Sequence, residues 1–173
     1  AALPGCASND STSLPSVITG SRSIYQLGGD VRINGQTANP STLINLGDVI
    51  ETFDKSYVIF VVNKDSFILR SSRKMTLPNK QTPAAPVSTA FALERGKVLS
   101  VLASRRTDIT TPNAVIGVRG TGVYIEAEPE QSYVCVCYGT SDISAINNPA
   151  LTETIVSEHH DAPRYIVSAK NTA

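Results

Sequence analysis

The segment Tyr57–Leu69 reads "YVIFVVNKDSFIL" and carries the clearest secondary-structure signal in the 173-residue chain. Its β-branched and aromatic residues are typical of strands. The polar stretch Asn63–Ser66 interrupts them where a tight turn fits. We therefore predict two strands joined by a short turn.

The same alternation of short apolar runs and turn residues continues on both sides of this segment. Turn residues about every 8–12 positions are typical of an all-β roll, sandwich or barrel of short strands with little helix. Helix signals are poor, and the best candidate is a turn or two at Ser88–Glu94, "STAFALE". Further predicted strands lie in "DVRING", "LGDVIETF", "KMTL", "TDITTPNAVIGV", "GVYIEAEPEQSYVCVCYG", "ETIVSEHH" and "RYIVSA".

Composition divides the chain into three parts. Residues 1–22 are predicted to be an extended N-terminal arm, residues 23–146 a β domain, and residues 147–173 a C-terminal segment that packs back on it. The arm's small polar stretch Cys6–Ser16 cannot bury much surface alone. We therefore expect it to pair with a sheet edge, and a neighbour's edge would give a homo-oligomer, or a fibre if the contact is head-to-tail.

Charge and hydropathy exclude several classes of protein. The 15 basic residues balance the 15 acidic ones, so no basic field attracts nucleic acid. The longest apolar run, Val58–Val62, is far shorter than the roughly 20 residues of a membrane-spanning helix. Residue 1 is Ala rather than Met, so we expect a leader to be removed and the protein to act outside the cytoplasm. No Gly-rich phosphate loop or G-x-S-x-G motif is present, and we expect a binding or structural module rather than an enzyme.

The stretch Thr111–Glu126, "TPNAVIGVRGTGVYIE", is the most specific motif in the chain. With "GGDVRING" and "FALERGKVLSV" in the same order, it resembles the FecR domain of bacterial extracytoplasmic proteins over roughly residues 28–143. The resemblance implies an exported all-β domain that is solenoid-like or roll-like. Glycines inside a strand pattern mark a bulge or a close approach of backbones, and an arginine between them could donate to carbonyls or a carboxylate. Four residues of the motif are predicted to form this structural turn: Gly117, Arg119, Gly120 and Thr121.

The resemblance also suggests an alternative function. The best-known type of FecR protein relays a signal from an outer-membrane iron transporter to a sigma factor, through a sigma-binding region and a membrane helix that precede the domain. We expect the fold and the compartment to carry over to this chain, and we keep a signalling receptor module with a protein partner at the cell envelope as the alternative. The segments "YVCVCYG" and "SEHHDAPRYI" resemble those of stand-alone FecR-domain proteins that carry both motifs.

Cys135 and Cys137 are two of the three cysteines in the chain. Side chains two residues apart in a strand share a face, which puts their Cβ atoms roughly 6.5–7 Å apart. A disulfide needs Cβ atoms about 3.5–4.5 Å apart, so the two should not bond to each other. Zinc bonds of about 2.3 Å require sulfurs roughly 3.8 Å apart, which tilted rotamers can reach.

His159 and His160, the only histidines, supply the other predicted ligands. In a straight strand they would face opposite ways, so one would join the cysteines, whereas a turn could present both. Asp161 could orient a histidine through its second ring nitrogen. Such a Cys/His set suits zinc first, with copper or an iron–sulfur cluster in a redox protein as alternatives.

Other roles for these residues remain open at the level of sequence. Buried cysteines often pack as small apolar groups, and the histidines could lie in a solvated turn. Cys6 could form a disulfide with a cysteine of the same chain or of a neighbouring molecule.

Overall fold

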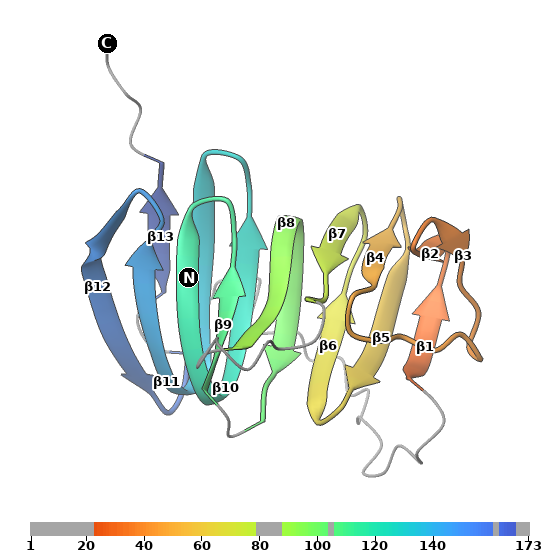
Figure 1. The fold of residues 1–173 in the computed structure, drawn as a ribbon, viewed down its shortest axis with the longest axis horizontal. Coiled ribbons are helices and arrows are strands. Elements are labelled where there is room, and N and C mark those ends of the chain that lie inside the picture. The colour runs from red at the N-terminus through yellow and green to blue at the C-terminus, as the bar shows by residue number, and fades with distance from the viewer. Residues whose placement is uncertain (1–22, 79–87, 104–105, 161–162, 169–173) are drawn as a thin grey trace.

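The structure, a computed structural model, describes residues 23–78, 88–103, 106–160 and 163–168 (Figure 1). These residues form thirteen strands and no helix, which confirms the all-β prediction. None of the described elements is a helix long and apolar enough to cross a membrane. In chain order the strands are β1 (Ile24–Gly28), β2 (Val31–Ile33), β3 (Gln36–Thr37), β4 (Val49–Thr52), β5 (Tyr57–Val62), β6 (Asp65–Leu69), β7 (Arg73–Thr76), β8 (Ser88–Val101), β9 (Arg106–Thr110), β10 (Ala114–Ala127), β11 (Gln131–Ala145), β12 (Asn148–Ser157) and β13 (Arg164–Val167).

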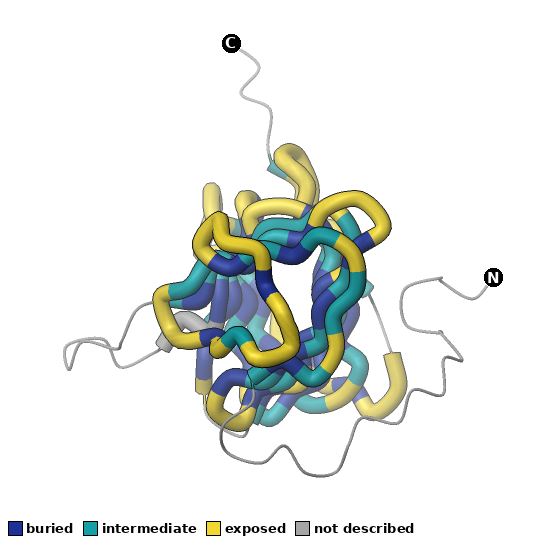
Figure 2. The backbone as a smooth tube through the Cα atoms, turned by 90° about the vertical axis from the view of Figure 1, so that its right-hand side faces the viewer, coloured by how far each residue is buried: buried dark blue, intermediate teal, exposed yellow. Residues whose placement is uncertain are grey.

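Strand pairing arranges the sheet as two walls. The first wall follows the order β12-β11-β10-β9-β8-β7-β4-β2-β3. The second runs β1-β5-β6-β8-β10-β11-β13, because β8 also pairs with β6 and β10, and β11 also pairs with β13. The long strands β8, β10 and β11 therefore belong to both walls, one half of each strand in each wall. The result is a roll whose backbone winds around a common interior (Figure 2).

Glycines in the left-handed region lie where the long strands pass from one wall to the other. Gly96 has φ 104° in β8, Gly120 has φ 61° in β10 and Gly139 has φ 93° in β11. Glycine adopts such angles without the steric cost that a Cβ brings. At Gly120 the pairing between β10 and β11 shifts between Arg119 and Gly122, as a bulge does.

The core fills the space between the walls. Strands β5 and β6 alternate buried and half-buried residues along their length, so one face of each packs inward. Phe60 and Phe67 stack with ring centroids 5.0 Å apart, and Phe67 meets Phe91 of the other wall edge-to-face at 5.5 Å. All three rings are at most 1% exposed. The contact between Phe67 and Phe91 joins the two walls.

The structure confirms the predicted pair of strands in Tyr57–Leu69 and places a strand at the helix candidate Ser88–Glu94. β5 and β6 are joined by a tight turn in which Asn63 has φ 57°. Ser88–Glu94 is the first part of β8, which pairs with β9 on one edge and with β7 on the other. Hydrogen bonding on both edges outweighs the helix preference of its alanine, leucine and glutamate residues. Residues 1–22, which contain the predicted arm and Cys6, lie outside the described residues.

Replacing Gly139 with alanine should destabilise the roll more than replacing Gly35, a glycine in an open turn. Both glycines have positive φ, so either alanine adds left-handed strain of about 1–2 kcal/mol. A Cβ at Gly139 would also lie 2.7 Å from the carbonyl oxygen of Gly120, whereas one at Gly35 meets nothing within 4 Å. Urea unfolding should therefore show a loss for Gly139→Ala that exceeds the Gly35→Ala loss by about 1 kcal/mol or more. Equal losses would contradict the close approach of Gly139 to the Gly120 carbonyl where β10 and β11 pass from one wall to the other.

Candidate metal centre

Two strands share one edge of β11 and leave a break opposite the cysteines. β12 pairs with β11 from Ala145 to Gly139, and β13 pairs with it from Val134 to Gln131. Both are antiparallel to β11, so β13 continues the path of β12 along the same edge. Between the paired positions, the chain has six residues on one path, 158–163, and four on the other, 135–138. Two more residues on one path than on the other interrupt the regular ladder, and the described residues 158–160 form a bend.

This bend brings His160 to the cysteines. The backbone N–H of His160 donates a hydrogen bond of 3.2 Å to the carbonyl oxygen of Cys137. His160 has φ 42°, in the left-handed region that residues with side chains rarely adopt. The ligand atoms of Cys135, Cys137 and His160 all lie within 4.8 Å of one another. Strained backbone at a cluster of potential ligands is typical of functional sites.

The two cysteines share the outer face of β11, as the period of a strand predicts. Val134 and Val136 belong to the hydrophobic core between the walls, whereas Cys135 and Cys137 do not. Cys135 is nevertheless buried, Cys137 is partly exposed and His160 is exposed. Cys135 and Cys137 are both thiols, in line with the prediction that they do not bond to each other.

The group of ligand atoms has three members and does not include His159. His159 lies in the same bend and is exposed, so the structure brings one of the two predicted histidines to the cysteines. Asp161, the predicted orienting carboxylate, lies outside the described residues. A tetrahedral zinc needs sulfurs roughly 3.8 Å apart, so the two sulfur atoms, which lie within 4.8 Å of each other, would have to approach by no more than about 1 Å.

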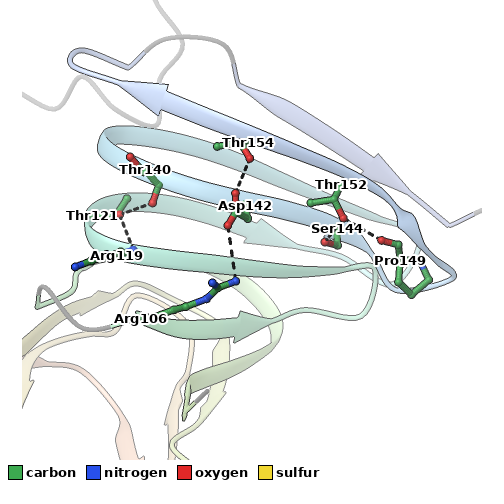
Figure 3. A network of polar contacts seen from close by, with 9 residues as sticks. All are labelled: Arg106, Arg119, Thr121, Thr140, Asp142, Ser144, Pro149, Thr152 and Thr154. Atoms are coloured by element: carbon green, nitrogen blue, oxygen red, sulfur yellow. Dashed lines mark hydrogen bonds and ion pairs between the residues drawn. The ribbon is translucent and has the colours of Figure 1, made fainter. Parts of the chain in front are cut away.

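A row of polar residues on the outer face of the first wall was not expected from the sequence. Asp108 of β9, Gly117 of β10 and Asp142 of β11 are direct neighbours across three strands. Because Gly117 has no side chain, Arg106 reaches across β10 to Asp142, with N and O atoms 3.9 Å apart (Figure 3). Thr154 of β12 donates a hydrogen bond of 2.6 Å to Asp142 from the other side.

The turn motif borders this row. Gly117 lies where a Cβ would approach the Asp108 carboxylate to 3.3 Å. Thr121 is fully buried, and its hydroxyl accepts from the backbone N–H of Arg119 at 3.2 Å and donates to the carbonyl of Thr140 at 2.9 Å. The Arg119 side chain itself is exposed. The predicted hydrogen bonds from the Arg119 guanidinium to a carbonyl or a carboxylate are not formed with any of the described residues, because this side chain projects outward.

Burial raises the pKa of Asp108, and the nearby Asp142 adds to the rise while Arg106 opposes it. A carboxyl whose pKa is higher in the folded state stabilises the fold most when it is protonated, and that contribution is lost as pH rises through the folded pKa. Replacing Asp108 with asparagine should therefore raise the free energy of unfolding relative to wild type at pH 7, with a gap that narrows toward about pH 3. Urea unfolding across this pH range tests it, and parallel profiles for the two proteins would contradict it.

The end of the roll beyond β11 forms a recess between the two walls, which we call the mouth. It has a volume of about 650 Å³ and is lined by residues of β11, β12 and β13. Leu151 of β12 is 65% exposed there, and Val167 of β13 is 60% exposed. Arg164 of β13 forms an ion pair with Glu153 of β12 across the mouth, and its hydrogen bond holds the pKa of Glu153 below its usual range.

Comparison with known proteins supports the fold. The chain resembles two crystal structures, at 1.65 and 2.50 Å resolution, of a "putative anti-sigma factor" from Parabacteroides distasonis, with TM-scores of 0.53 and 0.54. The identities are 14% and 13%, so the likeness shows the fold alone. The match covers 69% of this chain and 58% of each of those chains. No protein-family model and no curated protein matches the sequence.

Proposed function

We propose that this protein is an extracytoplasmic, non-enzymatic β-roll module that binds a transition metal through Cys135, Cys137 and His160. The observation that carries the proposal is the convergence of three ligand atoms within 4.8 Å at the break between β12 and β13. Two thiolates and an imidazole are the ligands that zinc prefers in proteins. Zinc is therefore the first candidate, ahead of copper and an iron–sulfur cluster.

A metal at this position would fasten the bend to the sheet. β12 and β13 contact β11 on either side of the break, while residues 158–160 within the break are exposed. A bond from His160 to the metal would tie this bend to two residues of β11. Because the ligands converge only in the folded chain, binding energy would add to folding energy.

The three ligands would leave one position of a tetrahedral zinc open. His160 is exposed, so solvent or a ligand from outside the chain could occupy that position. The site differs in this respect from a closed structural site with four protein ligands. It thus admits a role in binding as well as in stability.

Elemental analysis of the purified protein tests the proposal. We expect one transition metal per chain, lost when Cys135 and Cys137 are both replaced by serine. A colourless metal-loaded protein indicates zinc, whereas visible absorption indicates copper or iron–sulfur. A protein without stoichiometric metal, even after incubation with zinc under reducing conditions, would overturn it.

The second candidate function is a signalling module at the cell envelope. It is favoured by the likeness to the anti-sigma-factor structures, together with the FecR resemblance of the sequence. In that role the β-roll would dock onto a membrane-associated partner. Affinity capture from envelope extracts should then recover such a partner, and recovery of the protein alone would count against this candidate.

A further inference from the structure

The mouth is an uncovered end of the hydrophobic core. Ile143 and Ile155 are core residues of the last two strands of the first wall, and Ile166 of β13 packs against the same core. Leu151 and Val167 line the recess beyond them and are largely exposed. Rolls and solenoids need a cover at such an end, because the last strand buries its apolar face against nothing.

Both walls also end in open strand edges at the mouth. In the described part of the chain, β12 pairs with β11 alone and β13 pairs with β11 alone. The first seven residues of β12 are all exposed. An edge of this length, with unpaired N–H and C=O groups beside an apolar recess, accepts an added strand.

Residues 1–22 join the roll at its other end. They precede Ser23 and β1, and β1 and β3 lie at the opposite end of the long axis from β12 and β13 (Figure 1). Their sequence contains a β-branched run at Val17-Ile18-Thr19, which favours an extended strand. Fully extended, 22 residues span about 73 Å, more than twice the length of β12.

A second molecule is a better acceptor for this arm than its own chain. Within one molecule, β1 is separated from β12 or β13 by six strand-to-strand steps, through β5, β6, β8, β10 and β11. At about 4.8 Å a step this is about 29 Å, and the crossing would use about nine residues without pairing them. When the β1 end of one molecule meets the mouth of the next, no such crossing is needed.

We propose that residues 1–22 of one molecule add as a strand at the mouth of a second copy, and that Leu151 and Val167 contact the apolar residues of the arm. The contact is head-to-tail, so an assembly of any length retains one free arm at one end and one free mouth at the other and grows as an open series. The proposal does not depend on the metal site, because none of the mouth residues it uses is a proposed ligand.

Two variants of the full chain separate the arm from the mouth. Ile18→Asp should disable the arm, and Leu151→Asp should disable the mouth, since a buried charge at either side opposes docking. Val101→Asp is the matched control, because Val101 is an exposed valine of β8 away from the mouth. Light scattering under reducing conditions, which prevent disulfides through Cys6, measures the mass of each.

We expect oligomers of increasing mass for wild type and Val101→Asp, and monomers for each of the other two variants alone. A mixture of Ile18→Asp and Leu151→Asp should form a one-to-one dimer, because one supplies the mouth and the other the arm. Val167→Asp replaces Leu151→Asp if the latter lowers the melting temperature. A monomeric wild type would overturn the proposal, and it would mean that the arm docks at the mouth of its own molecule or at no mouth. A mixture of the two variants that stays monomeric would also overturn it.

Discussion

Replacing His160 with alanine should abolish the thermal stabilisation that zinc gives to the protein. Zinc that binds only the folded chain stabilises it by about 2.7 kcal/mol at a hundred times its dissociation constant and about 4.1 kcal/mol at a thousand times. For a chain of this size, each kcal/mol shifts the melting temperature by about 2–4 °C. We therefore expect zinc to raise the melting temperature of wild type by about 5–15 °C and that of His160→Ala hardly at all.

His159→Ala is the matched control for this measurement. His159 is adjacent, exposed and of the same type, but it lies outside the group of converging ligand atoms. Its removal should leave the zinc-dependent shift intact. If both variants lose the zinc-dependent rise in melting temperature, the bend presents both histidines to the metal. If both variants keep it, the proposed site is wrong.

Replacing Phe67 with alanine should cost about 3–5 kcal/mol of unfolding free energy, because the ring is 1% exposed, stacks on Phe60 of its own wall and meets Phe91 of the other wall. The control is Phe53→Ala. Phe53 is 39% exposed and carries Arg32 over its ring at 4.7 Å, so its loss should cost no more than about 1 kcal/mol.

Urea unfolding measures both variants. Similar losses for Phe67→Ala and Phe53→Ala would contradict a core that joins two walls through aromatic contacts. A large loss for Phe67→Ala alone supports the arrangement, because only this ring lies between strands of different walls.

Local signals in the sequence predicted the strands, and they failed where pairing partners decide the structure. The β-branched runs of Tyr57–Leu69 face inward at every second residue, so composition and period were enough for β5 and β6. Ser88–Glu94 has residues that favour a helix, but the edges of β7 and β9 on either side hold it as a strand. The sequence alone does not show which distant edges will meet.

The same distinction between local signals and strand pairing applies to the candidate site. The shared face of Cys135 and Cys137 follows from the period of a strand and could be predicted. The selection of His160 could not, because it depends on the break in pairing along β11 and on the bend of residues 158–160. The row formed by Asp108, Gly117 and Asp142 was missed for a similar reason, since only the register of three strands brings these residues side by side.

An anomalous diffraction measurement at the zinc edge, on crystals of the zinc-loaded full chain, shows directly whether Cys135, Cys137 and His160 bind the metal. We expect a single strong peak at the break between β12 and β13, about 2.3 Å from the Sγ atoms of Cys135 and Cys137 and about 2.0–2.1 Å from a ring nitrogen of His160. The absence of a peak at these three side chains, or a peak held by other residues, would contradict it.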